Sequence, residues 1–415
     1  MEAPRFVLEP PSTLSFTNSS GAELSCIATG SPSPRLRWLG RDGHPVLGIP
    51  GILKVLENGT MLLHPFSAEQ FRAEIHRGTF QCSASNPAGT VLSRETRLRA
   101  VVHHPYEVRV GDESVTVGNT AVFRCLLPSY VEDDVTVTSW FLGSKHNIYP
   151  QEEGGGEKYH MLPSGELLIH EVTKEDNGTW VGCRTASKLE GHSVSASTMA
   201  RLLVREEARP IPPRLVHLPR QVEARKDSSC LLTCVAHGNP PPQASVRRKL
   251  GNSVWDVPVR DGLLVKRVEE ADSTPNAFEC VARNRHGEAR QSLTIGVRAP
   301  LSAHVQPRMP VVDLREKATL VCGVVGMPTP EIHWVKDGRA VGRATGREDG
   351  GQRLLMDDGG QRLQVEDGGR RLVVPRMREE DAGVYQCFLS NDWDSAQDSV
   401  QLVLGGKAFM RVMKF

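Results

Sequence analysis

Short runs in which apolar and polar residues alternate follow one another along the whole chain. Examples are TLSF from residue 13, AELSCIA from 22, TAVFRCLL from 120 and QSLTIGV from 291. An alternation with a period of two places the apolar side chains on one face of a strand. Gly, Pro, Asn and Asp separate the runs, as turns between strands require. No stretch shows convincing helical periodicity, so the pattern predicts an all-β protein.

Cysteines recur along this pattern. Eight of the nine form four successive pairs whose members lie 46 to 65 residues apart. In three repeats a tryptophan follows the first cysteine by twelve or fifteen residues, at Trp38, Trp140 and Trp334. This order is typical of an immunoglobulin sandwich, where a disulfide joins two sheets about 10 Å apart and the indole fills the space beside it. We therefore expect four cross-links: Cys26–Cys82, Cys125–Cys183, Cys234–Cys280 and Cys322–Cys387.

The repeats divide the 415 residues into four tandem immunoglobulin sandwiches of an I-set-like type. The expected bounds are 1–101, 102–208, 209–300 and 301–406, followed by an unstructured tail at 407–415. A Pro-rich stretch, Arg209-Pro210-Ile211-Pro212-Pro213, separates the second domain from the third. Proline removes amide donors and favours an extended spacer, so the last strand of domain 2 should not run directly into the first strand of domain 3.

The third repeat departs from the others. Twelve residues after Cys234 stands Val246 instead of tryptophan, and Trp255 lies too far along to replace it, so this core must be filled differently. Cys230 and Cys234 compete for Cys280. Four positions before the first cysteine the other repeats place a small residue (Ala22, Ala121 and Ala318), so we interpret Cys230 as a buried free thiol. A metal site is the alternative, but no histidine or cysteine pair follows at finger spacing.

An aromatic residue precedes each second cysteine. It lies two residues upstream at Phe80, Phe278 and Tyr385, and three upstream at Trp180. Only Tyr385 carries the hydroxyl that the tyrosine corner of this fold requires. We therefore expect the fourth domain to be the most regular of the four.

The surface carries signs of an extracellular protein. Asn18, Asn58 and Asn177 stand in glycosylation acceptor tripeptides, and the paired cysteines need an oxidising compartment. No apolar run approaches the roughly 20 residues that span a bilayer, and Met1-Glu2-Ala3-Pro4 lacks the regions of a signal peptide. We expect a fragment of an extracellular protein, without a signal peptide or a transmembrane segment in this chain.

Composition and motifs argue against most other functions. The net charge is +1, from 50 basic and 49 acidic residues, so no nucleic-acid partner is expected. The chain has no sequence motif for a phosphate-binding glycine loop, a nucleophile elbow or an HExxH zinc helix. We therefore expect no enzymatic activity, no small-molecule substrate, no cofactor and no metal. His103 and His104 fit a solvated junction better than a metal pair. The repeats DGGQRL at 349 and 358 and DGGRRL at 367 are interpreted as an extension of an ordinary loop, a flexible hairpin or loop that is disordered by default, and not as a calcium site.

Four strings give the chain a family resemblance: YEVRVGDESVTVGNTAVFRCLLPSYVEDDVTVTSW, CVAHGNPPP, APLSAHVQP and GVYQCFLSNDW. Together they resemble the first four domains of the Dscam (Down syndrome cell adhesion molecule) family, especially its arthropod members, over residues 5 to 405. The resemblance implies a horseshoe in which domain 1 packs on domain 4 and domain 2 on domain 3. It also implies a membrane-anchored neuronal or immune receptor that recognises identical copies of itself through domains 2 and 3.

The stretch YEVRV at 106–110 should form the leading edge strand of domain 2. If two copies meet antiparallel about a two-fold axis through Val108, Glu107 of each copy faces Arg109 of the other. Such cross-strand pairs contribute only about 0.2 to 1 kcal/mol each, so they select a partner more than they supply affinity. Glu-x-Arg also occurs elsewhere in the chain, and the pair Glu223 and Arg225 in domain 3 is a second candidate.

Three functions remain open on this basis. The leading hypothesis is homophilic cell recognition at the extracellular face of the plasma membrane, as in neuronal self-recognition and axon guidance, with an identical copy on an opposing cell as the partner. The second is an immune receptor, soluble or membrane-bound, that resembles hemolin and binds microbial surface ligands. The third is a distal spacer of a receptor whose ligand contacts lie elsewhere.

Overall fold

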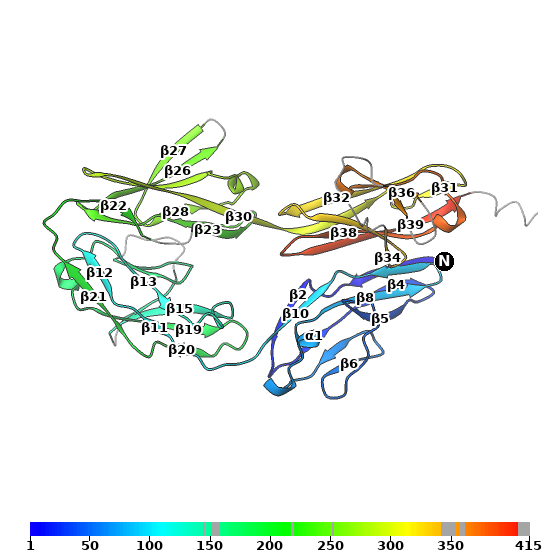
Figure 1. The fold of residues 1–415 in the computed structure, drawn as a ribbon, viewed down its shortest axis with the longest axis horizontal. Coiled ribbons are helices and arrows are strands. Elements are labelled where there is room, and N and C mark those ends of the chain that lie inside the picture. The colour runs from blue at the N-terminus through cyan, green and yellow to red at the C-terminus, as the bar shows by residue number, and fades with distance from the viewer. Residues whose placement is uncertain are drawn as a thin grey trace, which may run out of the picture. The chain divides into compact units, whose positions relative to one another are not determined.

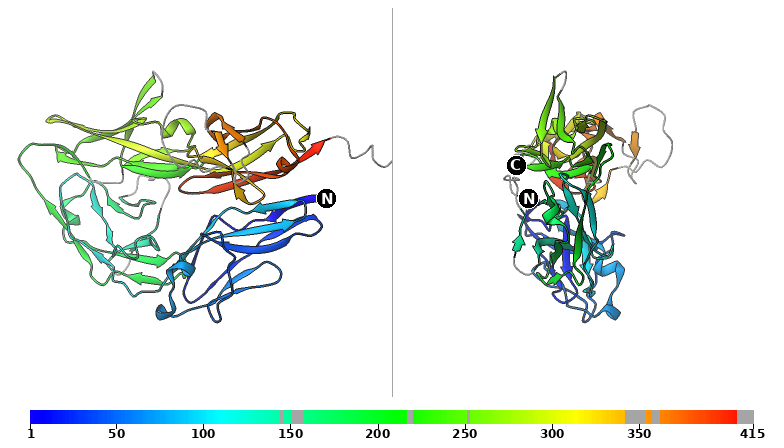
Figure 2. Two further views of the ribbon diagram at one scale, coloured as in Figure 1. Left: turned by 45° about the vertical axis from the view of Figure 1, so that its right-hand side comes forward. Right: turned by 90° about the vertical axis from the view of Figure 1, so that its left-hand side faces the viewer.

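The computed structural model describes residues 1–143, 146–150, 158–216, 220–250, 253–341, 354–356 and 362–405. Strands dominate the regular secondary structure of the described residues, in agreement with the all-β prediction (Figures 1 and 2). The chain divides into two compact units. One combines Met1–His103 with Ala299–Phe415, and the other is His104–Arg298. Domains 1 and 4 therefore share one unit, and domains 2 and 3 share the other.

Domain 1 is built from two principal sheets and a strand pair. One sheet has the order β2-β10-β8-β5 with β9 beside β8, the other has the order β3-β7-β6, and β1 pairs with β4. The only α-helix among the described residues, α1, is a single turn, and no described helix is long and apolar enough to cross a membrane. The bounds are β1 (Glu2–Leu8), β2 (Thr13–Thr17), β3 (Ala22–Leu24), β4 (Ile27–Ser31), β5 (Arg35–Gly40), β6 (Leu53–Val55), β7 (Met61–Leu63), α1 (Ala73–His76), β8 (Thr79–Asn86), β9 (Gly89–Leu92) and β10 (Thr96–Val101).

Domain 2 repeats this plan. One sheet has the order β12-β21-β19-β15-β16 with β20 beside β19, the other has the order β13-β18-β17, and β11 pairs with β14. The bounds are β11 (Arg109–Val110), β12 (Glu113–Thr116), β13 (Ala121–Phe123), β14 (Cys125–Leu126), β15 (Val135–Leu142), β16 (His146–Ile148), β17 (Tyr159–Met161), β18 (Leu167–Ile169), β19 (Trp180–Ser187), β20 (Ser193–Ser195) and β21 (Ala200–Arg205).

Domain 3 contains the order β27-β26-β29-β30 with β23 beside β30, and the strand pairs β24-β28 and β22-β25. Strand β21 ends at Arg205 and β22 begins at Ile211, so the last strand of domain 2 does not run directly into the first strand of domain 3, although residues 211–213 of the Pro-rich stretch belong to β22. The bounds are β22 (Ile211–Leu215), β23 (Gln221–Arg225), β24 (Cys230–Thr233), β25 (Ala236–Asn239), β26 (Gln243–Leu250), β27 (Ser253–Val259), β28 (Gly262–Val265), β29 (Phe278–Asn284) and β30 (Gly287–Gln306).

The 20-residue strand β30 continues from domain 3 into domain 4, so the expected boundary at residue 300 lies inside a strand. Its second half pairs with β32, and the order continues β32-β37-β36-β35. The second sheet of domain 4 has the order β31-β39-β38-β33-β34. The bounds are β31 (Val311–Asp313), β32 (Ala318–Met327), β33 (Glu331–Lys336), β34 (Arg339–Ala340), β35 (Leu354–Met356), β36 (Arg362–Glu366), β37 (Arg371–Val374), β38 (Gly383–Ser390) and β39 (Ser395–Gly405).

Four disulfides cross the cores, and they join the cysteines that the spacing pairs: Cys26–Cys82, Cys125–Cys183, Cys234–Cys280 and Cys322–Cys387. Each closes a loop of 46 to 65 residues, which restricts the unfolded chain by about 4 kcal/mol in the chain-entropy account. In three domains the indole Nε1 of the core tryptophan donates a 2.8 Å hydrogen bond to a glycine carbonyl, that of Gly59, Gly165 or Gly369. The buried indole is thereby satisfied.

In domain 3 the core is filled differently, as the sequence predicts. Val246 lies opposite Cys280 in the pairing of β26 with β29, the place that tryptophan takes in the other domains, and it is fully buried. Trp255 lies on β27 and is half exposed. Cys230 is a buried free cysteine at the first residue of β24. The equivalent first residues of the other domains are the three alanines named above.

The repeated segment of domain 4 corrects the expectation of a disordered loop. Residues 354–356 and 362–366 form β35 and β36, which pair with each other. The third repeat makes the turn between β36 and β37, where Gly369 has a φ of +94° that favours glycine and its carbonyl accepts the hydrogen bond of Trp334. The remaining repeat residues and the tail at 407–415 lie outside the described residues.

The tyrosine corner of domain 4 is present. The buried Tyr385 hydroxyl donates a 2.9 Å hydrogen bond to the carbonyl of Asp381. In domain 2 the inward position two residues before Cys183 is taken by the buried Val181. Trp180, one residue earlier, points to the other face of the strand, where the guanidinium of Arg201 lies 4.9 Å from the ring centroid.

Candidate functional site

The candidate recognition motif of domain 2 lies at the start of that domain. The side chains of Glu107 and Arg109 are both 68% exposed, and Arg109 Nη2 lies 3.0 Å from Glu107 Oε2. Val108 between them is completely buried in the core of domain 2. The strand pattern therefore places the two charges together in solvent and uses the valine as an anchor beneath them.

The backbone around this motif corrects the predicted strand. Only Arg109–Val110 is strand (β11), and it pairs with β14. The Val108 carbonyl accepts hydrogen bonds from the amide and the hydroxyl of Ser197, at 3.0 and 3.3 Å. The Pro105 carbonyl accepts a hydrogen bond from the Tyr130 hydroxyl. Because the Val108 carbonyl already accepts two hydrogen bonds within domain 2, a strand from a second copy cannot bind it without displacing Ser197.

The candidate of domain 3 lies on an edge strand. Glu223 and Arg225 are exposed residues of β23, which pairs in parallel with β30 and has no other partner among the described strands. Glu223 is already engaged within the domain, because Arg298 Nε lies 2.9 Å from Oε2 and Gln221 donates to Oε1. The equivalent edge strand of domain 2 is β12, which pairs in parallel with β21. The structure therefore places the two candidate motifs at different points of their domains.

Domains 2 and 3 are joined by a buried contact. The side-chain amide of Asn119 donates from Nδ2 to the Gly238 carbonyl at 3.0 Å and accepts at Oδ1 from the Gly238 amide at 2.9 Å. Asn119 is only 2% exposed. The contact also includes a cluster of apolar side chains: Val122, Leu162 and Leu168 of domain 2 and Val235 of domain 3. The pairing of domains 2 and 3 that the resemblance implies is thus present within one unit.

A buried group of ionisable side chains lies at the same contact. His160 Nδ1 of domain 2 is 2.6 Å from Oδ2 of Asp261 in domain 3, and His170 Nε2 is 3.3 Å from the same oxygen. Burial by itself raises the pKa of the Asp261 carboxyl, but the hydrogen bonds from the two imidazoles outweigh it and hold the pKa well below its usual range. The carboxylate therefore stays ionised at the domain contact.

Sequence reasoning missed this group. Asp261 stands more than 90 residues after the two histidines and in another repeat, so no local spacing in the sequence brings the three residues together. A neighbouring histidine, His237, places Nε2 2.6 Å from the Thr120 carbonyl, and burial lowers its pKa. Three histidines thus serve one contact between domains.

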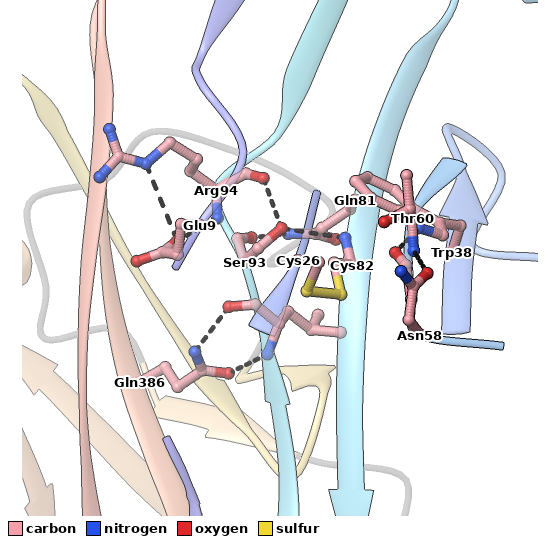
Figure 3. Close-up of a disulfide and its surroundings, with 12 residues drawn as sticks. Glu9, Cys26, Trp38, Asn58, Thr60, Gln81, Cys82, Ser93, Arg94 and Gln386 are labelled. Carbon is pink, nitrogen blue, oxygen red and sulfur yellow. Dashed lines mark hydrogen bonds and ion pairs between the residues drawn. A yellow bond between two sulfur atoms is a disulfide. The ribbon is translucent and has the colours of Figure 1, made fainter. Parts of the chain in front are cut away.

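Domains 1 and 4 meet in a similar way. The fully buried Gln386 of domain 4 accepts a 2.8 Å hydrogen bond from the Leu92 amide and donates one of 2.8 Å to the Leu92 carbonyl. Figure 3 shows this side chain near the Cys26–Cys82 disulfide, with Glu9 and Arg94 beside it. Gln397 of domain 4 also donates to Glu9. Both units therefore join their two domains through an amide side chain that binds the backbone N–H and C=O of one residue in the other domain.

The three predicted acceptors of glycosylation differ in their surroundings. Asn58 and Asn177 are exposed, and each uses only the carbonyl oxygen of its side chain, toward the amides of Thr60 and Val204. Asn18 is half-buried, and its Nδ2 donates to the Phe66 carbonyl. Only the first two therefore present the reactive nitrogen to solvent.

Comparison with known proteins places this arrangement in a family. An immunoglobulin domain model matches residues 302–391. A crystal structure of the N-terminal four Ig domains of Dscam1 isoform 1.9 is 33% identical, covers 97% of this chain and 99% of its own, and has a TM-score of 0.85. A structure that concerns Dscam isoform specificity is 33% identical with a TM-score of 0.85 and covers 98% of this chain and 100% of its own. The chain belongs to the Dscam family.

Longer members of the Dscam family are also similar in sequence to this chain. Cell adhesion molecule Dscam1 of Drosophila melanogaster is 34% identical over 98% of this chain, and cell adhesion molecule DSCAM of Homo sapiens is 31% identical over 94%. The chain spans about a fifth of the length of these curated relatives, 19% and 18%. The Dscam family is non-enzymatic, and the similar solved structure comprises four Ig domains, as this chain does.

Proposed function

We propose that this chain is the recognition end of a cell-surface adhesion protein, which binds an identical copy of itself through domains 2 and 3 on the extracellular side of the plasma membrane. The observation that carries the proposal is the exposed pair of Glu107 and Arg109 above the buried Val108. The relatives are named cell adhesion molecules, and a similar structure concerns isoform specificity, which supports recognition as the common role.

The charges of domain 2 favour selection over affinity. In the single chain Glu107 and Arg109 already pair with each other, so a two-fold dimer exchanges two pairs within chains for two pairs between chains. Exposed pairs gain little from such an exchange. If a partner carries two like charges at 107 and 109, one of them faces a like charge of this chain. The resulting repulsion lowers the affinity for that partner. Since Ser197 already binds the Val108 carbonyl, side chains and the backbone of neighbouring residues must make the contact.

Charge exchange between two variants tests this contact. Glu107→Arg and Arg109→Glu each give a chain with two like charges, and each should self-associate about 2- to 30-fold more weakly than the natural chain in sedimentation equilibrium, as two lost pairs of about 0.2 to 1 kcal/mol imply. Mixed together, the two variants should form heterodimers, because every Arg then faces a Glu of the other chain. An ion pair within one chain cannot explain this result, because each variant carries two like charges at these positions.

Arg378 and Glu380 provide the matched control. They form an exposed pair of the same spacing in domain 4, at 3.2 Å. Arg378→Glu and Glu380→Arg should leave self-association unchanged, alone or mixed. Variants of Glu107 and Arg109 that self-associate like the natural chain would sink the proposed contact of domain 2, and the same pair of exchanges at Glu223 and Arg225 would then test domain 3. A strictly monomeric chain that binds microbial glycolipid would replace homophilic recognition with the hemolin-like function.

Asn58 and Asn177 are the proposed glycosylated residues, because their Nδ2 atoms face solvent while that of Asn18 is engaged by Phe66. Glycopeptide mass spectrometry of the secreted protein should find glycan at the first two residues. Full occupancy at Asn18 with empty sites at the other two would reverse this assignment.

A further inference from the structure

Three buried side chains at the contact of domains 2 and 3 have the composition of a metal site. His160 lies on β17, His170 directly follows β18, and Asp261 lies in the turn between β27 and β28. The two histidines are 2% exposed and the aspartate is 7% exposed. One ligating atom of each lies within 4.8 Å of the others. Donor atoms from three separate segments thus converge where water has little access.

The orientation of the imidazoles suits metal ligands. His160 presents Nδ1 and His170 presents Nε2 to the same carboxylate oxygen. The opposite nitrogen of His170, Nδ1, lies 3.3 Å from the Thr120 hydroxyl. Metal-bound histidines commonly donate their second ring N–H to such a partner, which fixes the tautomer and the direction of the ring. The Thr120 carbonyl is in turn bound by His237, so this partner is itself held.

We propose that His160, His170 and Asp261 bind a divalent transition-metal ion, with Zn²⁺ as the first candidate. Two imidazoles and one carboxylate are the ligand types that Zn²⁺ and its neighbours in the first row take, whereas Ca²⁺ and Mg²⁺ prefer oxygen ligands alone. Three protein ligands leave a fourth position for water. The inference concerns a site separate from the recognition motifs and does not depend on the proposed self-binding.

The two distances from Asp261 to the histidines are close to those of a tetrahedral site, and all three donor atoms lie within 4.8 Å of one another. With Zn–ligand distances of about 2.0 to 2.1 Å, ligand atoms in a tetrahedral site lie about 3.3 Å apart. His170 Nε2 already lies at that distance from Asp261 Oδ2, at 3.3 Å, whereas His160 Nδ1 is closer, at 2.6 Å. The ion takes the place of the proton that now joins His160 to the carboxylate, and the two groups separate by about 0.7 Å, the difference between the tetrahedral spacing and the present one.

The site would fasten one domain to the other. Two ligands belong to domain 2 and one to domain 3, so the metal adds a link between them beside the Asn119–Gly238 contact. An ion that binds only the joined domains stabilises the folded chain in proportion to the logarithm of its concentration above Kd. Zinc would therefore act on the stability of the domain pair.

Cobalt substitution tests the proposal directly. The full chain is stripped with a chelator, desalted and titrated with Co²⁺ and then with Zn²⁺. One equivalent of Co²⁺ should bind with visible absorption bands of a four- or five-coordinate site, and Zn²⁺ should displace it. His170→Gln and Asp261→Asn should weaken binding by more than about 10-fold, since each removes a ligand and not only a supporting partner.

His76→Gln is the matched control, because His76 is a fully buried histidine of domain 1, in the other compact unit and away from the proposed ligands. It should keep the cobalt spectrum and the rise in unfolding temperature that Zn²⁺ produces, while His170→Gln loses both. Far-UV circular dichroism checks that each variant is folded. If a variant does not fold, the cobalt absorption spectrum of the natural chain tests the proposal by itself. Absence of one-equivalent binding, or equal binding in all variants, would show that the three side chains form a hydrogen-bonded contact only.

Discussion

At the scale of single residues, the cores show how one fold accepts different fillings. Three domains place an indole beside the disulfide and satisfy its N–H with a glycine carbonyl. Domain 3 places Val246 there, and Cys230 takes a position that is alanine in the other domains. A buried cysteine without a partner behaves as a small apolar side chain. Its thiol is therefore expected to be inert.

The pH dependence of stability tests this view of Cys230. Burial raises the pKa of the thiol to about 11, and the nearby charge of Asp272 adds to the rise. A group whose pKa is higher in the folded state binds more protons there, so its stabilising contribution is complete below the usual thiol pKa and is lost as pH rises from about 9 to 11. In urea titrations the difference in unfolding free energy between the natural chain and Cys230→Ala should fall over this range.

Other groups that titrate in this range are present in both proteins, so they cancel in the difference. A difference that stays constant from pH 8 to 11 would show that the thiol is accessible in the folded chain, about as free to ionise as in the unfolded chain. Alanine is the suitable replacement because Ala22, Ala121 and Ala318 occupy the equivalent strand position.

At the scale of strands and sheets, the two domain contacts follow one chemical plan. A side-chain amide from one domain takes both the N–H and the C=O of a single residue in the other, Asn119 with Gly238 and Gln386 with Leu92. The arrangement imitates one rung of a β-ladder without a strand. It fixes the position of the facing strand because both groups must be met at once.

Asn119→Ala tests the strength of this plan. The substitution leaves the buried amide and carbonyl of Gly238 without their partner, and each unsatisfied group costs about 1 to 3 kcal/mol. We expect a loss of about 2 to 4 kcal/mol in the unfolding free energy of the unit that holds domains 2 and 3, allowing for partial rehydration. Urea titration of the full chain measures it. Asn147→Ala, at an exposed asparagine of domain 2, should change stability by less than about 0.5 kcal/mol.

At the scale of the whole molecule, the sequence predicts the features that recur in each repeat. It does not predict the groups of residues that form only where two domains meet. Cysteine spacing and strand alternation depend on local periodicity, so the all-β class, the disulfides and the special core of domain 3 follow from them. The group of His160, His170 and Asp261 forms only when two domains meet, and no periodicity describes that meeting. The candidate recognition motif of domain 2 is predicted only in part. Alternation places Glu107 and Arg109 on one face of the chain, but the hydrogen bonds of Val108 with Ser197 depend on a distant loop.

The repeated DGGQRL segment shows the same limit. A nine-residue period of polar residues and glycines is typical of a loop, which gave the expectation of disorder. Short apolar runs separated by polar residues and glycines also suit hairpins, and β35 pairs with β36 in the structure. Since strand pairing is decided by the neighbouring sheet, the segment alone does not distinguish the two outcomes.

The replacement of tryptophan by valine in domain 3 has an optical consequence. A disulfide next to an indole quenches its fluorescence, so the buried Trp38, Trp140 and Trp334 should be dim in the native protein, whereas the half-exposed Trp180, Trp255 and Trp393 emit freely. Unfolding of domain 1, 2 or 4 releases a quenched fluorophore and brightens the emission. Unfolding of domain 3 releases no quenched fluorophore, because its one tryptophan, Trp255, is already half exposed, so this domain adds no such brightening.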